Sequence, residues 1–453
     1  MAIPPLGSVP RAASYTHRLL RRVVAVEPDE VKAVLLGFAW FGCLLSGYYL
    51  LRPLRDAMGL VGGPQELRWL FTATFVTMLL LVPAFGFLVT KLSPRRFVPL
   101  AYRLFAVTLL AFSAAMAIHA DSVWLGRTFF VWVSVFNLFV VSIFWSVLDD
   151  CFSSEQGRRL FGFIAAGGTF GTIVGPALAA AAVSVLGPMA LALLAALLLE
   201  VALRCFRGIY PAPSREGGDS AQAAHPQSSP LGGQVWAGLS LIARSPYLLG
   251  ICAYLLLHTA ASTFLYFEQG RIVAESLTDT VSRTRYFAAV DFSVSSLTLA
   301  LQVFLTGRLM KRFGLVLCLA ILPVVTVVAF GALALAPTLL VLALVQVARR
   351  ALDYAIARPA REVLFTVVSR EEKYKAKNAI ETLVYRGGDA VSGWLSSALS
   401  AVGVGLGGIA VVAMPVAATW CALCVWLAKR QDTMRQRADA ATTKESLTTS
   451  EAT

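Results

Sequence analysis

Apolar residues occur in long stretches that are separated by short polar or charged segments. A helix needs about 20 mainly apolar residues to cross the hydrocarbon core of a bilayer. Glycine and proline at Gly187-Pro188 and at Pro337 predict tight turns between neighbouring helices. The pattern therefore predicts an all-α polytopic membrane protein with twelve transmembrane helices, at residues 31–54, 67–90, 97–118, 123–148, 160–186, 188–206, 248–266, 286–309, 315–336, 338–357, 379–401 and 405–428.

Polar segments divide this pattern into two halves of six helices each. Residues 211–233 are rich in Ser, Gln, Gly and Pro, a composition that cannot bury a hydrophobic core. We therefore expect a cytoplasmic tail at 1–30, a six-helix bundle at 31–206, a flexible cytoplasmic linker at 207–247, a second six-helix bundle at 248–428 and a disordered cytoplasmic tail at 429–453.

Basic residues concentrate in the tails and in the loops on one side of the predicted helices. The net charge of +13 could indicate nucleic-acid binding, but an excess of Lys and Arg also marks cytoplasmic loops. The placement predicts a multi-pass protein of the cell (inner) membrane, surrounded by a lipid bilayer, with both termini in the cytoplasm and no nucleic acid polymer as a partner. The loop with Arg271, Arg283 and Arg285 is an exception. The charges that carry the prediction are Arg11, Arg18, Arg21, Arg22, Lys32, Lys91, Arg95, Arg96, Arg158, Arg159, Arg308, Lys311, Arg312, Arg370, Lys373, Lys375, Lys377, Lys429 and Arg430.

Signatures of enzymes are missing from the sequence. It contains no Walker-type phosphate loop, no HExxH and no G-x-S-x-G. Cys421 and Cys424 form a CxxC, but they lie in an apolar run without a second pair, so we expect them to pack inside a helix. Asp149 and Asp150 end a predicted helix without clustered histidines nearby. We expect no enzymatic activity, no metal and no cofactor.

The first predicted helix ends in arginines. An ionised side chain in hydrocarbon costs roughly 2.5–3.5 kcal/mol, so it normally faces a hydrated cavity or a charged partner. Tyr48, Arg52 and Arg55 follow i, i+4, i+7 and share one face, with Pro53 removing a backbone hydrogen bond beside them. Guanidinium groups suit carboxylate or phosphate oxygens. We expect this face to line a cavity; the alternative is that the arginines reach the membrane surface or pair with Asp56.

The helix predicted at 338–357 carries the longest polar face, and such a face belongs against a cavity or a polar partner. We predict that Arg349, Arg350 and Asp353 bind substrate, and the competing account is a salt bridge that holds the helices together. Arg358 and Arg361 can equally be interfacial. The face consists of Gln346, Arg350, Asp353, Ala357 and Arg361, with Arg349 at its margin.

The helix predicted at 286–309 has a polar face made of Asp291, Ser295, Thr298 and Gln302. Asp291 can couple a proton to transport or balance an arginine, and hydrogen bonding between helices is the alternative.

The helix predicted at 379–401 contains Tyr385 and Arg386, which we predict to face the substrate. The spacing of Arg386 and Asp389 predicts a local ion pair. His258, in the helix at 248–266, is predicted to be a packing residue.

Glycines repeat every four residues at Gly167, Gly171 and Gly175. This small-xxx-small spacing predicts close packing against another helix.

Two loop segments repeat a short motif. Gly86-Phe87-Leu88-Val89-Thr90-Lys91 and Gly307-Arg308-Leu309-Met310-Lys311-Arg312 both fit G-x-L-x-x-[KR]. The motif resembles a loop motif of the major facilitator superfamily, although Thr90 and Lys311 stand where that family has an acidic residue. The resemblance implies two six-helix halves around a central site.

Three further segments are 48–56 (YYLLRPLRD), 357–365 (ARPAREVLF) and 372–378 (EKYKAKN), the last continuing to 384–389 (VYRGGD). They resemble the nucleotide-exchange transporter family, the ATP/ADP translocases of plastids and intracellular bacteria. The resemblance implies exchange of a nucleoside triphosphate for a diphosphate. Known exchangers use lysines and glutamates within the membrane, whereas Arg52 and Arg55 stand here, so the architecture and the anion cavity transfer more directly than the substrate.

These observations predict a secondary transporter that exchanges a nucleotide or another phosphorylated organic anion by alternating access. Its partner is an anionic small molecule, with ATP and ADP as candidates, and the pattern carries no signal for an oligomeric state. A proton-coupled exporter of a drug-like or lipid-like solute, and a non-transporting membrane sensor or assembly factor, are the alternatives. The predicted substrate-binding residues are Tyr48, Arg52, Arg55, Arg349, Arg350, Asp353, Tyr385 and Arg386, with Asp291 as the coupling residue.

Overall fold

The computed structural model describes residues 24–119, 122–210, 240–368, 376–377 and 379–451, and these residues are almost entirely helical. The first half consists of α2 (Val31–Met58), η1 (Pro64–Glu66), α3 (Leu67–Lys91), α4 (Pro94–Ile118), α5 (Val123–Cys151) and α6 (Ser154–Ile209). The second half consists of α8 (Pro246–Ser276), α9 (Thr280–Leu301), η2 (Gln302–Thr306), α10 (Gly307–Leu335), α11 (Leu339–Leu352), η3 (Asp353–Ala357), α12 (Arg358–Leu364), η4 (Phe365–Val367), η5 (Ile380–Val384), α14 (Tyr385–Ala401) and α15 (Leu406–Glu451).

Eight helices in the described part of the chain are long and apolar enough to cross a membrane. Two of them hold two predicted spans each, because the backbone leaves helical geometry at Gly187 (φ 75°, ψ 176°) and at Gly314 (φ 71°, ψ −173°). Glycine adopts positive φ at no steric cost, so these residues turn the chain between neighbouring spans. The predicted spans at 338–357 and 379–401 correspond to α11–η3–α12 and to η5–α14, in which π-helical turns interrupt the α-helix, and the last predicted span lies in α15. The fold is that of an all-α polytopic membrane protein, as the apolar pattern predicts.

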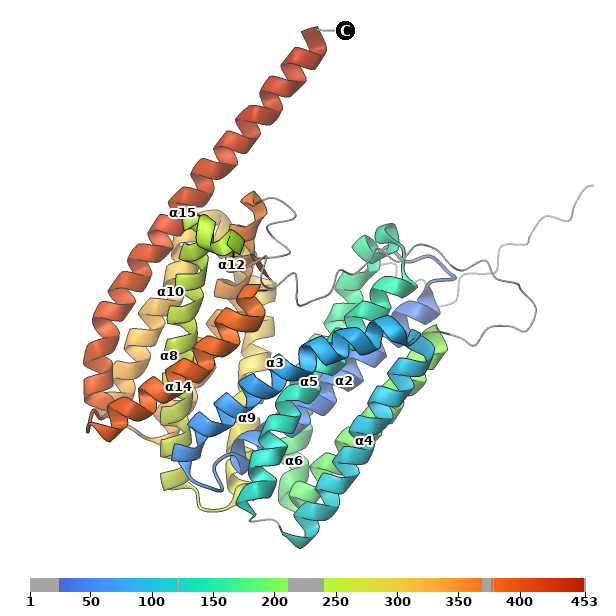
Figure 1. Ribbon diagram of the computed structural model, residues 1–453, viewed down its shortest axis with the longest axis vertical. Coiled ribbons are helices and arrows are strands. Elements are labelled where there is room, and N and C mark those ends of the chain that lie inside the picture. The colour runs from blue at the N-terminus through green and yellow to red at the C-terminus, as the bar shows by residue number, and fades with distance from the viewer. Residues whose placement is uncertain (1–23, 120–121, 211–239, 369–375, 378, 452–453) are drawn as a thin grey trace, which may run out of the picture.

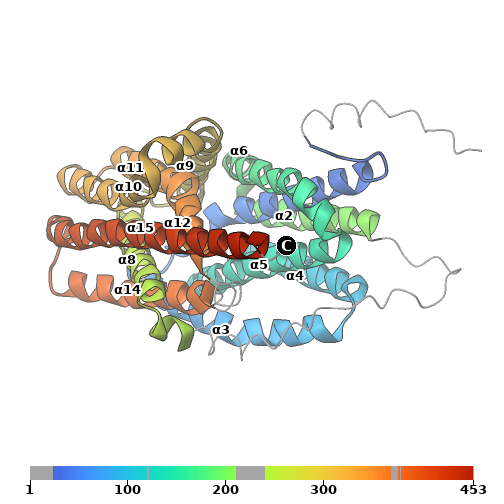
Figure 2. The ribbon, with the colours of Figure 1, turned by 90° about the horizontal axis from the view of Figure 1, so that it is seen from above.

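The helices form two bundles, α2–α6 and α8–α15, that meet at one end and diverge toward the other (Figure 1). Seen from above, the two bundles lie side by side (Figure 2). Each bundle has its own core, around Trp40 and Phe136 in the first and around Tyr254 and Trp420 in the second. The connections α3–α4 and α5–α6 and the end of α15 lie on the diverging side (Figure 1).

The closed end is held by apolar contacts and hydrogen bonds between the bundles. A hydrophobic cluster combines Leu60 and Leu67 of the first half with Leu265, Ile272 and other residues of the second. Across the same junction, the Arg283 guanidinium donates to the Leu60 carbonyl oxygen (3.3 Å). The bundles are therefore joined at one end, which leaves the other end free to open.

The repeated glycines let α6 pack directly on α2. A Cβ atom on Gly171 would lie 2.5 Å from the carbonyl oxygen of Gly42, and one on Gly175 would lie 2.6 Å from the carbonyl oxygen of Ser46. Such distances leave no room for a side chain. The close packing predicted from the small-xxx-small spacing is confirmed, and it fixes the helix that carries Arg52 and Arg55.

The C-terminal tail is helical in the structure. The composition of residues 429–453 predicts disorder, but α15 continues as a helix to Glu451 and projects beyond the bundle (Figure 1). The tail is polar, but it contains no Gly or Pro and many good helix formers, so the helix that starts in the membrane has no residue that would stop it. Most of the predicted N-terminal tail and linker lies outside the described residues.

The α2–α6 contact predicts how glycine substitutions affect stability. We expect Gly171→Ala to lower the thermal unfolding temperature of the purified protein, because overpacking costs about 1–3 kcal/mol. Gly162→Ala is the matched control in the same helix, since a Cβ atom there meets nothing within 4 Å. It should leave the unfolding temperature unchanged or raise it slightly through helix propensity. Equal unfolding temperatures for the two variants would contradict the packing account.

Candidate functional site

A cavity of about 2200 Å³ lies between the two bundles. Asp56, Gln269 and Gln346 line it near the junction of the bundles, and Lys91 and Asp150 line it near the diverging end. The cavity therefore runs from the closed end to an opening on the side of the α3–α4 connection. The nine predicted site residues all line it: Tyr48, Arg52, Arg55, Asp291, Arg349, Arg350, Asp353, Tyr385 and Arg386.

Asp291 holds arginines from both halves. Its Oδ1 atom lies 3.3 Å from the Arg52 Nη1 atom of α2 and 2.7 Å from the Arg350 Nη2 atom of α11. Asp291 is buried, and its Oδ2 atom has no hydrogen-bond partner among the described residues. The salt bridge that is the competing account for Arg350 is present, and both residues also line the cavity, whereas substrate binding by Arg350 and coupling by Asp291 stay predictions. One carboxylate shared by two guanidiniums leaves one positive charge without a counter-charge.

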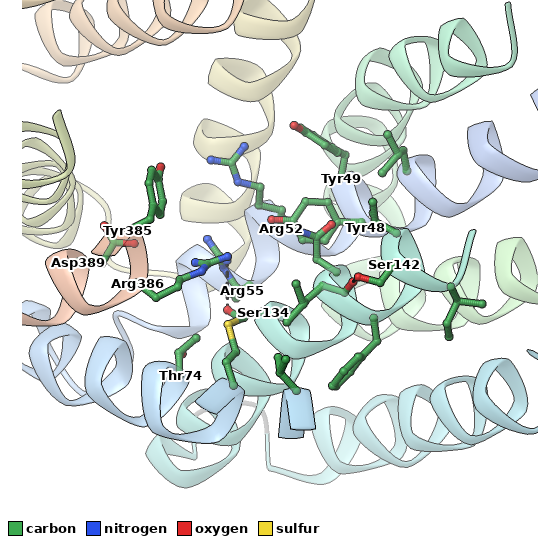
Figure 3. A pocket seen from close by; sticks show the side chains of 18 of the residues that line it. Tyr48, Tyr49, Arg52, Arg55, Thr74, Ser134, Ser142, Tyr385, Arg386 and Asp389 are labelled. Carbon is green, nitrogen blue, oxygen red and sulfur yellow. Dashed lines mark hydrogen bonds between the residues drawn. The ribbon is translucent and has the colours of Figure 1, made fainter. Parts of the chain in front are cut away.

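Arg55 forms an ion pair with Asp56 and also lines the cavity. Its Nη2 atom lies 2.6 Å from the Asp56 Oδ1 atom, and its Nη1 atom donates to the Ser134 hydroxyl (3.4 Å). Tyr266 of the second half donates to the same Asp56 oxygen (2.9 Å). The guanidinium also lies 4.8 Å from the centre of the Phe130 ring, a cation–π distance. Figure 3 shows Arg52 and Arg55 facing the cavity, with Tyr385 and Arg386 on its other side.

The second half contributes a buried polar group around Arg349. Arg349 is 5% exposed, yet its Nε and Nη1 atoms have no hydrogen-bond partner within the described part of the chain. His258 lies beside it in the wall, with Nε2 3.7 Å from the Asp353 Oδ2 atom and Nδ1 unpaired among the described residues. The His258 ring also packs against Tyr385 and Trp420. The prediction that His258 is a packing residue is therefore incomplete, because the side chain also lines the cavity.

The predicted ion pair between Arg386 and Asp389 is wrong. Asp389 accepts a hydrogen bond from the Thr263 hydroxyl (3.0 Å), and no ion pair between Arg386 and Asp389 forms in the described structure. The two residues stand one α-helical turn apart, but Thr263 of the adjacent α8 takes the carboxylate. Arg386 is left facing the cavity without an anionic partner among the described residues (Figure 3).

The π-helical segment η3 shifts the polar face by one residue. The α-helical phase of Gln346 and Arg350 places Ala357 in the cavity wall, but Ala357 is buried in the core of the second half. Tyr354 and Arg358 line the cavity in its place, followed by Arg361. The wider turn of a π-helix rotates all following side chains, and such turns are frequent at functional sites. The Thr306 hydroxyl of η2 donates to the Ala355 carbonyl oxygen (2.8 Å), one of the backbone groups in the irregular turn.

Charge in the cavity wall is unevenly balanced. The lining contains seven arginines and one lysine against six aspartates. Two of these aspartates, Asp149 and Asp150, lie at the diverging end of the cavity. The excess of arginine over aspartate is therefore greater toward the closed end. Arginine forks bind carboxylate and phosphate oxygens in two-point geometry. The site is suited to hold an anion.

Comparisons with known proteins agree with this architecture. The sequence profile of the Major Facilitator Superfamily matches residues 33–345. No curated protein matches the chain in sequence.

Solved transporter structures share the fold at low sequence identity. A bacterial homologue of the iron transporter ferroportin, in an inward-facing state, has 12% identity and a TM-score of 0.63, covering 89% of this chain and 100% of its own. A POT family transporter in complex with 5-aminolevulinic acid has 10% identity and a TM-score of 0.61, covering 89% and 96%. The nucleoside transporter NupG has 14% identity and a TM-score of 0.55, covering 89% and 99%. Identities this low establish the fold alone.

The shared carboxylate predicts a stability effect. Asp291→Asn removes the negative charge between Arg52 and Arg350, and breaking a buried ion pair costs about 3–5 kcal/mol. We expect the unfolding temperature of the purified protein to fall, and the additional change Arg52→Gln to restore part of it. Asp389→Asn is the control, because that carboxylate forms no ion pair among the described residues. An Asp291→Asn variant as stable as the wild type would show that Asp291 does not hold the arginines.

Proposed function

The chain belongs to the major facilitator superfamily and is a multi-pass membrane protein and a secondary transporter, and from this premise we propose that its substrate is a phosphorylated organic anion. Nucleotides such as ATP and ADP are the candidates that follow from the resemblance to nucleotide exchangers. We propose counter-exchange by alternating access, in which the two bundles rock about the central cavity.

The observation that carries the proposal is the set of cavity arginines without a counter-charge. Arg349 and Arg386 line the cavity and form no ion pair among the described residues, and Arg52 and Arg350 share one carboxylate. An uncompensated buried charge is costly, so a substrate that supplies the missing negative charge gains binding energy from all four groups. A mainly apolar pocket with one acidic residue, which an exporter of drug-like cations would need, is a poorer description of this wall.

Asp291 supports a coupling role in this scheme. It links α2 of the first half to α9 and α11 of the second, where the bundles meet. An anion that binds Arg52 and Arg350 competes with Asp291 for the same donors and weakens the contact between the bundles. Substrate binding and the closed end are thereby linked energetically, as alternating access requires.

The position of the cavity opening supports a particular orientation of the protein in the membrane. Lys91 at the end of α3 and Arg95 and Arg96 in the first turn of α4 flank the connection on the open side of the cavity, and basic segments of this kind are typically cytoplasmic. We infer that the conformation is open to the cytoplasm and that both termini lie there.

Counter-exchange can be measured in proteoliposomes. Liposomes loaded with ADP should take up labelled ATP faster than empty ones, and parallel samples should contain glycerol 3-phosphate, glucose 6-phosphate or citrate. Exchange with at least one phosphorylated anion is expected. If none of these anions exchanges, and labelled uptake equals that of protein-free liposomes, the proposed function is wrong.

Variants of the unpaired arginines test the site. Arg349→Gln and Arg386→Gln should each reduce the exchange rate at low substrate concentration by about tenfold to hundredfold, the loss expected for a hydrogen bond between charged groups. Arg204→Gln is the control, since Arg204 is exposed on α6 and does not line the cavity. Protein amounts in the liposomes must be equal. Unchanged exchange in both cavity variants would exclude these arginines from the site.

A further inference from the structure

The two walls of the cavity differ in polarity. In the second half, the residues of α8 that line the cavity are His258, Ser262, Thr263, Tyr266 and Gln269. Every one of these side chains has a group that can form a hydrogen bond. The second half therefore presents a polar wall, to which the arginines add positive charge.

The opposite wall, formed by α3, is apolar over a long distance. Between Phe75 and Phe85, its lining residues are Phe75, Met78, Leu79, Val82 and Phe85. They follow the spacing i, i+3, i+4, i+7, i+10 and so lie on one face of the helix. At 1.5 Å per residue, this face extends for about 15 Å.

The apolar face begins next to the arginines. Phe71, one turn before Phe75 on α3, packs on Phe130, whose ring lies against the Arg55 guanidinium, and on Tyr266, which donates to Asp56. Thr74 lines the same cavity as Arg55 and Ser134 (Figure 3). Near its other end, the Phe85 ring packs on Phe139 of α5, with 4.5 Å between the ring centres. The face thus leads from the cationic centre of the cavity toward its open end.

Contact with lipid does not account for this face. Val76 and Leu80 point away from the cavity wall and are 46% and 68% exposed, as expected for residues that face acyl chains. Val82 is half-buried and borders the open cavity instead, next to Met78, which is buried against Val135 and Phe139. Apolar surface in contact with water is unfavourable until another apolar group covers it, and binding sites combine such surface with a few placed polar groups.

We propose that the substrate is an amphipathic anion, with a phosphate or carboxylate head on the arginines and an aliphatic body along α3. This inference rests on the proposed function, because it assumes that the cavity arginines bind the anionic group. A nucleobase could stack on one aromatic ring, but it would leave most of an extended face of this length uncovered. A flexible aliphatic chain covers the whole face.

Binding of two labelled probes tests the inference. The full-length protein in nanodiscs is titrated with ³²P-labelled methyl phosphate and with ³²P-labelled octyl phosphate, and binding to empty nanodiscs is subtracted. We expect octyl phosphate to bind about tenfold more tightly or better, the gain from burying about two methylene groups.

Substitutions on the two faces of α3 locate the effect. Met78→Gln and Val82→Thr should each reduce the preference for octyl phosphate and leave the affinity for methyl phosphate unchanged. Val76→Thr makes the same chemical change as Val82→Thr on the face that does not line the cavity, and it should keep the full preference. A preference that survives in both cavity-face variants would overturn the placement along α3.

Other outcomes separate this inference from the proposed function. If the two probes bind equally well and Arg386→Gln weakens both, the anion site stands and the aliphatic body is wrong. If neither probe binds, the arginines do not form an anion site, and the proposed function and this inference both fall.

Discussion

Positive charge buried within the membrane is the constraint on which the rest of this structure depends. Guanidinium groups in a low-dielectric interior require compensation, and the chain supplies it incompletely. Asp291 is shared by Arg52 and Arg350, whereas Arg349 and Arg386 have no ion-pair partner within the described residues. The proposed substrate supplies the missing negative charge. Because Asp291 connects the two bundles, binding of that substrate can change the contact between them.

The packing of the first half makes this arrangement possible. Gly171 and Gly175 bring α6 against α2 and fix the helix that carries Arg52. The hydrophobic cluster around Leu60 and Leu265 then joins the bundles near the arginines while the other end stays open. A substrate that competes for the arginines acts next to this junction, where a small change in contact energy can shift the balance between two orientations of the bundles.

Periodicity in the sequence predicts much of this molecule. Apolar stretches locate the helices, and the polar face of α2 identifies Tyr48, Arg52 and Arg55 as cavity residues. Prediction from periodicity is wrong where the helix geometry departs from the regular α-helix or where a residue of another helix takes the expected partner. The π-helical turn at η3 moves the cavity face from Ala357 to Arg358, and no residue pattern marks it.

Contacts between distant segments are likewise hidden from the sequence. The pairing of Arg52 with Asp291 joins two halves of the chain, and helix spacing contains no information about it. The local pair expected for Arg386 and Asp389 gives way to a hydrogen bond from Thr263 in another helix. The apolar face of α3 cannot be distinguished from a lipid-facing surface until the opposite wall is placed across the cavity.

In the proposed mechanism, Asp291 and an anion compete for Arg52 and Arg350. Binding of labelled inorganic phosphate to the wild type and to Asp291→Asn, in nanodiscs below the unfolding temperature of both, measures this competition directly. Because the variant frees Arg52 and Arg350, phosphate should bind to it about tenfold more tightly than to the wild type. Equal or weaker binding by the variant would show that Asp291 and the substrate do not share these arginines.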